Sequence, residues 1–408
     1  MPTNRRDFIR TSAGALAAMA IVPDLALGRS LRLDAMPVGL IGAGRQGRVL
    51  MGEIQKIPGA TIAAVCDPVE SRLAAGLRRA PGAQGFADHR ALLERSDIQA
   101  VFIATPTHLH RTIAEAALAA GKHVYCEAPI AHTVDDAKAV VRAARSSSKV
   151  FMPGLEGRSN PVYQLARTFF RSEAVRDLVS MRAQQHEKIS WRTPVSNPAD
   201  ERALNWRLDN AVTTGLPGEW GTHQFDVFHW YTDRRPLRVR GVGSIRLHDD
   251  GRTLPDSVAC LVEYEGGRTL SYEATLANSY EGRYEVLYGT NAAIKLAWSH
   301  GWMFKEADAP TQGWEVYANR QQFHNDEGIT LIADATQLAS QGKLQEGVGL
   351  PHPSAYYAVE DFLGACAGGE APPVTAADAL RATALGIAAH RAVLEGVTID
   401  ITDEMLTA

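Results

Sequence analysis

One stretch decides the fold of this chain: Val38-Gly39-Leu40-Ile41-Gly42-Ala43-Gly44-Arg45-Gln46-Gly47. An apolar strand enters a G-x-G-x-x-G turn, a helix-compatible run follows over Arg48–Ile57, and a second apolar run, Ala60–Cys66, ends at Asp67. In this order the first glycine makes the tight turn, the second lets the backbone approach a pyrophosphate, and the third lets helix and strand pack closely. The phosphates then lie at the helix N-terminus. The stretch therefore predicts a dinucleotide-binding fold rather than an ordinary packing turn.

An acidic residue, Asp67, follows twenty positions after Gly47. A carboxylate in this place accepts hydrogen bonds from an adenosine ribose, which favours NAD over NADP. NADP is the alternative, because Arg45 or Arg72 can reach a 2′-phosphate. We expect NAD to be held by Gly42, Gly44, Arg45, Gln46, Gly47 and Asp67.

The N-terminus reads as a targeting segment rather than as part of the fold. Paired arginines in Asn4-Arg5-Arg6-Asp7-Phe8 precede an apolar run, Ala13–Val22, and a small-residue cleavage pattern, Ala26-Leu27-Gly28. The apolar run is shorter than the ~20 residues of a membrane span, so an anchor is the weaker interpretation. Residues 1–28 resemble a twin-arginine export signal, and we expect a periplasmic chain, delivered by that machinery with its cofactor tightly bound.

The composition of the 408 residues is that of a soluble enzyme with room for two or three domains. Lys plus Arg number 42 against 46 for Asp plus Glu, so the chain lacks the basic excess of a nucleic-acid-binding protein. The four cysteines have no C-x-x-C spacing, which favours buried free thiols over a metal site, with disulfides as the alternative in an oxidising compartment. We expect neither a metal nor a nucleic-acid partner.

Strands and helices alternate through the first part of the chain. The expected elements after Asp67 are the strand Ile98–Ala104, a helix to Ala120, the strand His123–Cys126, a helix over Thr133–Ser148 with Thr133 as N-cap, and the strand Lys149–Met152. This alternation predicts a parallel sheet. Residues 36–154 are therefore expected to form an NAD(P)-binding Rossmann domain.

Beyond Asn160 apolar and polar residues alternate, as is typical of an antiparallel sheet with one buried face. The expected strands are Val175–Glu187, Leu237–Leu247, Ser257–Glu265, Arg268–Leu276 and Tyr284–Leu296, with a two-residue hairpin turn at Gly266-Gly267. Residues 354–395 have helical spacing. The predicted fold class is α/β: the Rossmann domain, an α+β domain at 155–350 with a large open, mostly antiparallel sheet, and a helical segment at 351–408 that packs back on the first domain.

Four motifs together resemble the Gfo/Idh/MocA family of sugar and polyol oxidoreductases. They are Gly42 to Gly47, Thr105-Pro106 with His110, Gly121-Lys122-His123-Val124 leading to Glu127-Ala128-Pro129, and Gly221-Thr222-His223-Gln224-Phe225-Asp226. The resemblance covers nearly all of the mature chain. It implies oxidation of carbohydrate hydroxyls with NAD or NADP and an open sheet that serves homo-oligomer formation. One branch of the family uses a bound nicotinamide to break glycosidic bonds.

One position departs from the family pattern. Members usually have Glu-Lys-Pro, whose lysine helps to polarise or deprotonate the reacting hydroxyl, whereas this chain has Glu127-Ala128-Pro129. Ala128 cannot move a proton. Glu127 and Pro129 are still expected to shape the loop beside the nicotinamide, with a cis peptide at Pro129. The departure also leaves open a degenerate site that keeps the cofactor only as structure.

A second group of residues offers proton transfer. Glu219, His223 and Asp226 stand at spacings of four and three, which places them on one face of a helix. By the resemblance, His223 aligns with the family's acid or base, and Glu219 stands where Asp is frequent. We expect His223 to be the catalytic base, Glu219 to orient its imidazole and Asp226 to be structural.

The remaining candidates lie at loop positions. Thr105 and Pro106 match a family loop that lines the nicotinamide, and His110 follows a parallel strand at the end where such sheets bind ligands, although capping of the next helix explains it equally. Lys188 is a candidate second base in place of the missing lysine. Aromatic and cationic residues at 186–192 and 205–207 either pack against a sugar ring or form a solvated rim.

The sequence thus predicts an exported oxidoreductase that moves hydride between a bound nicotinamide and a sugar, polyol or glycoside hydroxyl. The alternative enzyme is an NAD-dependent glycosidase that works by oxidation, elimination, hydration and reduction without net use of NAD. A non-catalytic sugar-binding or assembly protein is the third interpretation, motivated by Ala128.

Overall fold

The computed structural model describes residues 33–310, 320–323, 326–331 and 349–408. The expected export signal at residues 1–28 lies outside these ranges. The described chain divides into a larger unit, built from Leu31–Asn160, Met181–Glu285 and His352–Ala408, and a smaller unit from Pro161–Ser180 and Val286–Pro351. Each unit is described by itself.

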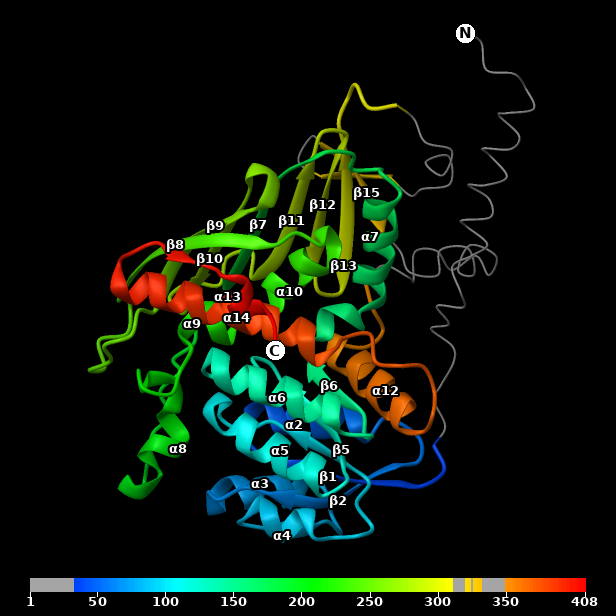
Figure 1. Ribbon diagram of the computed structural model, residues 1–408, viewed down its shortest axis with the longest axis vertical. Coiled ribbons are helices and arrows are strands. Elements are labelled where there is room, and N and C mark those ends of the chain that lie inside the picture. The colour runs from blue at the N-terminus through cyan, green and yellow to red at the C-terminus, as the bar shows by residue number, and fades with distance from the viewer. Residues whose placement is uncertain (1–32, 311–319, 324–325, 332–348) are drawn as a thin grey trace, which may run out of the picture. The chain divides into compact units, whose positions relative to one another are not determined.

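The first part of the larger unit is a six-stranded parallel sheet of order β3-β2-β1-β4-β5-β6 (Figure 1). Its strands are β1 Met36–Ile41, β2 Ala60–Cys66, β3 Gln84–Phe86, β4 Ala100–Ile103, β5 His123–Glu127 and β6 Phe151–Gly154. Its helices are α2 Arg45–Ile54, α3 Glu70–Arg79, α4 His89–Leu93, α5 His110–Ala119 and α6 Val134–Ser146, with short 3-10 turns η1 Thr107–Leu109 and η2 Glu156–Arg158. This confirms the expected Rossmann architecture.

Local signals place these elements. All four residues of β4 are buried, as a strand covered on both faces requires. The hydroxyl of Thr133 accepts the Asp136 N–H at 3.1 Å and caps α6, whose first turn carries Asp135 and Asp136 beside the positive end of the helix dipole. Helix α2 begins at Arg45, three residues before the expected start, because the helix opens inside the glycine turn.

A second, mostly antiparallel sheet follows in the larger unit. Its strand order is β7-β10-β9-β8-β16, with β7 and β10 parallel and the other pairs antiparallel. The strands are β7 Leu178–His186, β8 Pro236–Ser244, β9 Ser257–Tyr264, β10 Arg268–Thr275 and β16 Ile399–Asp400. Alternate residues of β9 and β10 are buried, which explains the period of two in the sequence.

The hairpin between β9 and β10 is three residues long, not two. Tyr264 pairs with Arg268, and the turn η5 Glu265–Gly267 lies between them. Gly266 and Gly267 have φ of 75° and 72°, a left-handed conformation that residues with a side chain adopt at a cost. The glycines therefore mark the hairpin correctly, while its length also includes Glu265.

Helices connect and cover these sheets in the larger unit. They are α8 Glu201–Asn205, α9 Gly215–Glu219, α10 Gly221–Thr232, α12 Ser354–Cys366, α13 Ala376–Glu395 and α14 Asp403–Leu406, with 3-10 turns η3 Pro198–Asp200 and η4 Trp206–Leu208. The C-terminal helices return to the Rossmann elements: α12 packs on α2, and α13 packs on α6 (Figure 1). A capping box formed by Thr375 and Asp378 starts α13, and Gly396 ends it.

The smaller unit holds α7 Pro161–Arg171 and the strands β12 Ala292–Ala297, β13 His300–Lys305, β14 Arg320–Phe323 and β15 Asp326–Leu331, in the order β14-β15-β13-β12. Strand β11 Arg283–Gly289 crosses from the larger unit into it. The single strand expected at Tyr284–Leu296 is therefore two strands, because the chain turns at Thr290 and Asn291.

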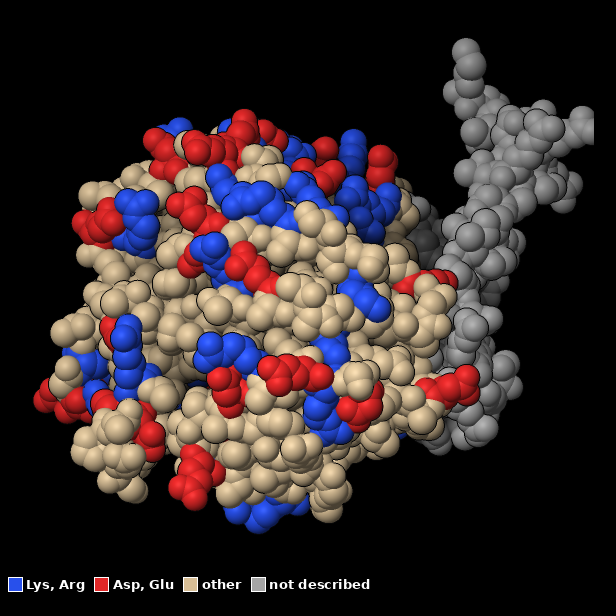
Figure 2. All heavy atoms as spheres, turned by 60° about the horizontal axis from the view of Figure 1, so that its bottom comes forward, with Lys and Arg blue, Asp and Glu red and all other residues tan. Residues whose placement is uncertain are grey.

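Three further observations concern the surface and the cysteines. Lys and Arg are interspersed with Asp and Glu on the face shown in Figure 2. Among the described residues, no helix has both the length and the apolarity to cross a bilayer, and no cluster of three or more His, Cys, Asp or Glu side chains is arranged to hold a metal ion. Cys66, Cys126, Cys260 and Cys366 are free thiols.

Candidate active site

The glycine turn leaves room for a ligand at one position and none at the other two. A Cβ added to Gly42, whose φ is 98°, would lie 2.5 Å from the Ala104 carbonyl oxygen, and one added to Gly47 would lie 1.9 Å from the Gly42 carbonyl oxygen. A Cβ on Gly44 would meet no atom within 4 Å. Two glycines are thus required by the packing of the turn, whereas Gly44 faces open space of the kind that a pyrophosphate fills. The turn fits a dinucleotide.

Asp67 is tied to the same turn. Its carboxylate accepts the N–H of Ala43 and the N–H of Val69, both at 2.9 Å. Burial raises the pKa of this carboxyl, while the two backbone N–H groups and Arg72 act in the opposite direction. Each oxygen keeps a second lone pair for a ribose hydroxyl. Arg45 and Gln46 follow Gly44 directly at the start of α2.

The loops after β4 and β5 meet at His110. Its Nδ1 lies 2.8 Å from the Pro129 carbonyl oxygen and its Nε2 lies 2.9 Å from the Thr105 carbonyl oxygen. Burial lowers the pKa of His110, and the two carbonyl groups oppose that shift. His110 therefore joins the Thr105-Pro106 loop to the Pro129 loop, and the buried hydroxyl of Thr105 has no protein partner.

The loop that carries Ala128 is shaped from both sides. The Ala128–Pro129 peptide bond is cis, as predicted. Glu127 accepts a hydrogen bond from Gln46 Nε2 at 3.0 Å, which ties the loop to the glycine turn, and the N–H of Ile130 donates to the Thr383 hydroxyl of α13 at 3.3 Å. Burial raises the pKa of Glu127, and the neighbouring Glu156 carboxyl raises it further.

His223 stands against this loop, in the first turn of α10. Its imidazole is close enough to the Ala128 backbone for that backbone to act on its pKa, and its Nδ1 has no protein partner. Burial lowers the pKa of His223 to about 3; Arg283 adds to the shift and the Ala128 backbone opposes it. The ring is therefore neutral at neutral pH and offers one nitrogen as a proton acceptor. The structure brings His223 to the position where the family lysine is missing.

Glu219 does not orient His223, contrary to the expectation from their spacing. Helix α9 ends at Glu219 and α10 begins at Gly221, with Trp220 as the junction at φ −108° and ψ −46°. The four-residue spacing places side chains on one face only within a continuous helix, and here the helix is broken.

The Glu219 carboxylate has other partners. The hydroxyls of Thr107 and Thr214 donate to it at 3.1 and 2.7 Å, and Arg207 Nε lies 3.9 Å away. Burial raises the pKa of Glu219, whereas Arg207 and the threonine hydroxyls oppose the shift. Glu219 thus fastens η1, which follows β4 of the Rossmann sheet, to α9.

Asp226 anchors α10, as its expected structural role requires. Arg158 Nε and Nη2 donate to its two oxygens at 2.9 and 2.8 Å, and Arg158 Nη2 also lies 3.2 Å from Asp378 of α13. Both Asp226 and Arg158 are buried. This network holds the helix of His223 against η2 and α13.

The other candidates lie on the chain between β7 and α9. Lys188 is exposed and its backbone N–H donates to the Ser279 hydroxyl at 2.7 Å. The Arg207 guanidinium lies over the ring of Trp206 at 4.5 Å and near the ring of Trp191 at 5.7 Å. His186 ends β7 and lines a groove over β8, β9 and β10. The structure brings the aromatic and cationic residues together and leaves the Lys188 side chain at the surface.

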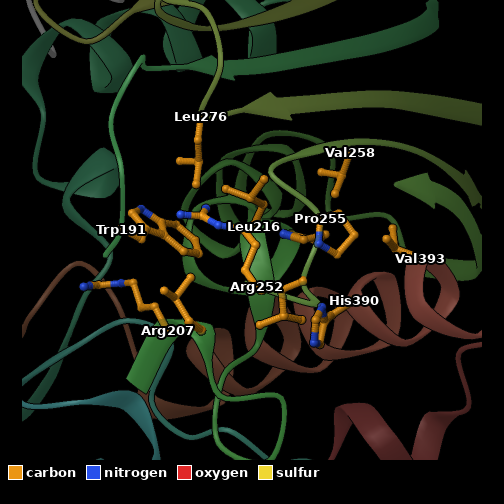
Figure 3. A pocket seen from close by; sticks show the side chains of 13 residues that line it. Trp191, Arg207, Leu216, Arg252, Pro255, Val258, Leu276, His390 and Val393 are labelled. Atoms are coloured by element: carbon orange, nitrogen blue, oxygen red, sulfur yellow. The ribbon is translucent and has the colours of Figure 1, made fainter. Parts of the chain in front are cut away.

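A small cavity of about 10 Å³ lies beside this cluster (Figure 3). Trp191 and Arg207 line one side and His390 of α13 lines another. The Nε2 of His390 is buried without a protein partner, and burial lowers the pKa of His390 to about 4. The volume is about that of one water molecule. The sequence did not predict that His390, Thr107 and Thr214 lie at this site, because no local pattern indicates contacts between segments so distant in the chain.

A family model described as an oxidoreductase family with an NAD-binding Rossmann fold matches residues 36–155, and a model of the GFO/IDH/MocA C-terminal domain matches residues 164–295. A levoglucosan dehydrogenase of Pseudarthrobacter phenanthrenivorans is 27% identical over 293 residues, which are 64% of this chain and 73% of that protein. A protein of Shewanella sp. named glycosyl hydrolase family 109 protein 2 is 32% identical over 159 residues, 33% of this chain and 35% of that protein.

A solved levoglucosan dehydrogenase in complex with NADH and L-sorbose has the same fold, with a TM-score of 0.72 at 22% identity over 91% of this chain and all of that one. Its likeness agrees with the two family models, which together cover most of the described sequence. The glycine turn lies in the part of the chain that matches the NAD-binding Rossmann model, and the chain belongs to the Gfo/Idh/MocA family of oxidoreductases.

Proposed function

We propose that this protein oxidises a hydroxyl group of a sugar or polyol with NAD, and that His223 accepts the hydroxyl proton. The observation that carries the proposal is the contact between the His223 imidazole and the Ala128 backbone, in the loop where family members usually place a lysine. The relatives support the substrate class, since a levoglucosan dehydrogenase is among them.

The cofactor is held by the residues that fit it. Gly44 lies open for the pyrophosphate and Asp67 stands at the end of β2 for the adenosine ribose. Glu127, fixed by Gln46, and the free hydroxyl of Thr105 face the nicotinamide end. When bound, the nicotinamide supplies the acceptor for a hydride from the substrate carbon.

The protein itself contributes the proton acceptor and its orientation. The neutral imidazole of His223 has one unpartnered nitrogen, Nδ1, and Ala128 contributes only a methyl group to the loop beside it. Asp226 and Arg158 fix the helix that carries the ring, whereas Glu219 fixes the adjoining loop. In this arrangement His223 takes the hydroxyl proton as hydride leaves the same carbon.

The sugar itself is proposed to lie against Trp191 and Arg207, whereas the Trp206 ring is buried beneath the Arg207 guanidinium. Aromatic faces pack on the apolar face of a sugar ring, and the guanidinium carries several hydrogen-bond donors. Arg207 is about half-exposed in spite of its place between the two rings, so it is accessible to a ligand.

The test is reduction of NAD by a panel of sugars and polyols, followed by His223→Ala on any substrate found. We expect turnover to fall about 100-fold or more with cofactor binding intact, the usual scale for loss of a positioned base. His229→Ala is the matched control, because His229 lies on the same helix with Arg381 at 3.0 Å rather than at the loop. Turnover equal to wild type in both variants would refute the role of His223. A panel in which no sugar reduces NAD and no aryl glycoside is hydrolysed would favour a non-catalytic protein.

A redox-neutral glycosidase is the second candidate, favoured by Ala128 and by the 159-residue similarity to the glycosyl hydrolase protein. A ring hydroxyl is oxidised to a ketone, the neighbouring C–H is thereby acidified, elimination expels the aglycone, water adds, and the ketone is reduced. Hydrolysis of aryl glycosides with no net change in NADH absorbance, and with solvent deuterium entering the neighbouring carbon, would select this reaction over the dehydrogenase.

We further infer that NAD is preferred over NADP and that the mature chain is exported and starts near Arg29. The paired arginines and the short apolar run support export. Cell fractionation and N-terminal sequencing test it: recovery of the full-length chain in the cytoplasm of a host with intact export would overturn it.

A further inference from the structure

The chain between β7 and α9 runs from Glu187 to Asp209, and we call it the strap. It is cross-linked within itself. Asn205 accepts the N–H of Thr193 at 2.6 Å and donates to its carbonyl oxygen at 3.0 Å, and Arg202 pairs with Asp209 at 3.2 Å. Such contacts hold the strap as one body, although it contains only short helical turns.

The strap touches the Rossmann domain at three places. Glu187 pairs with Arg45 at 3.1 Å, the carbonyl oxygen of Ala203 accepts Arg72 Nη1 at 3.4 Å, and the ring of Trp206 lies 6.2 Å from that of His108. Asp200 of the strap also attracts Arg72. All these residues belong to the larger unit.

The three places follow the cofactor site from one end to the other. Arg72 interacts with Asp67, which marks the adenosine ribose. Arg45 follows Gly44, which marks the pyrophosphate. His108 lies two residues after Pro106, in the turn whose Thr107 binds Glu219 at the nicotinamide end. A segment attached at these points crosses the whole length of a bound dinucleotide.

Charge supports the same placement. Partial burial lowers the pKa of Arg207 of the strap, Arg72 and Arg45 lower it further, and Glu219 opposes the shift. Arg45, Arg72 and Arg207 are thus close enough to act on one another, and Arg45 itself follows Gly44 in the glycine turn. Two phosphates carry the negative charge that such a cluster attracts.

We propose that the strap, Glu187–Asp209, is the outer wall of the dinucleotide site and retains NAD between turnovers. The proposal rests on the proposed function only for the identity of the ligand. It predicts a cofactor that exchanges slowly, as suits a reaction that returns its hydride to the same site or to a second carbonyl substrate before the cofactor leaves.

The attachments of the strap set how it opens. The Arg45–Glu187 pair is exposed, with 72% and 39% of the two side chains accessible, and exposed pairs of this kind are individually weak. The internal contacts are separate from the attachments. Opening therefore releases these polar contacts together with the Trp206–His108 ring contact, while the strap itself stays folded.

The experiment measures exchange of labelled NAD on the purified protein by rapid gel filtration, with no substrate present. Glu187→Gln combined with Asp200→Asn removes the Arg45–Glu187 ion pair and the attraction between Asp200 and Arg72 without altering the Rossmann domain. Asp209→Asn is the control, because its partner Arg202 is within the strap. We expect the double variant to release NAD roughly three to ten times faster than wild type, the range that one exposed ion pair and one longer-range attraction supply, and the control to match wild type.

The rate of NAD association distinguishes a strap that covers the site from a strap that only contacts the bound NAD. If the strap covers the site, the double variant also binds NAD faster, so that the dissociation constant changes less than either rate. The proposal would be overturned if the double variant released NAD at the wild-type rate, or released it faster without also binding it faster. It would also be overturned if the wild-type protein lost its NAD in one gel-filtration step. Failure of the proposed function has a different signature, because retention would change as expected while no sugar reduces NAD.

Discussion

Replacement of Arg158 by Met is expected to be the most damaging single change to the support of His223. Arg158 donates to both oxygens of Asp226 and also lies 3.2 Å from Asp378. The side chains of Arg158 and Asp226 are 7% and 1% exposed. Methionine keeps most of the volume and leaves a buried carboxylate without its partner.

The magnitude follows from that burial. Breaking a buried ion pair by removing one partner costs about 3–5 kcal/mol, because the remaining charge stays in a poorly solvated place. Burial already raises the pKa of Asp226 in spite of Arg158, so the charged carboxylate is poorly stabilised even with its partner present. Removal of Arg158 therefore destabilises the folded state further. Since domains are stable by about 5–15 kcal/mol, Arg158→Met is expected to remove a large fraction of the free energy of unfolding.

Urea unfolding measures this free energy, and a shift of midpoint at constant slope indicates a change in stability. Arg111→Met is the matched control: Arg111 pairs with Glu115 and Asp136 but is 45% exposed, so a loss below about 1 kcal/mol is expected. The double variant Arg158→Met with Asp226→Leu should recover much of the stability. An Arg158→Met protein no less stable than the control would refute the reasoning.

Three further predictions concern other positions. Gly47→Ala should destabilise the fold, because its Cβ would lie 1.9 Å from the Gly42 carbonyl oxygen, whereas Gly44→Ala should leave the melting temperature unchanged and weaken NAD binding measured by calorimetry. Burial lowers the pKa of His390 to about 4, so the unfolded chain binds this proton more readily than the folded chain. The free energy of unfolding should therefore be full above about pH 6.5 and should fall by up to about 3 kcal/mol as the pH falls towards 4. His390→Gln should make the free energy of unfolding less dependent on pH in this range. Asp67→Ala should weaken NAD more than NADP in fluorescence titrations, and equal losses would contradict the ribose assignment.

The Rossmann domain could be predicted from sequence because its signals are local. The glycine turn, the apolar strands and the Thr133 cap each act within a few residues, and the structure has all of them. The cis-proline loop was predictable only through the family resemblance. Its support could not be predicted, since it comes from Thr383, far along the chain.

The helix break at Trp220 shows where local reasoning failed. The spacing of Glu219 and His223 suggested one helix face, but Gly218 and Gly221 flank the break and Pro217 stands within α9. These three residues were the available signal. The partners of Glu219 and the attachments of the strap depend on tertiary packing, which the periodicity of the sequence does not encode.

The bond between Thr383 and Ile130 has a consequence for the order of events during synthesis. It joins residues 253 positions apart, so the Ala128–Pro129 loop acquires this backbone partner only when translation is nearly complete. At about 5–20 residues per second, the glycine turn emerges from the ribosome roughly ten seconds to a minute before α13 does. An interrupted chain therefore carries the glycine turn while the Ala128–Pro129 loop still lacks this support, so the two parts of the candidate site are completed at different times.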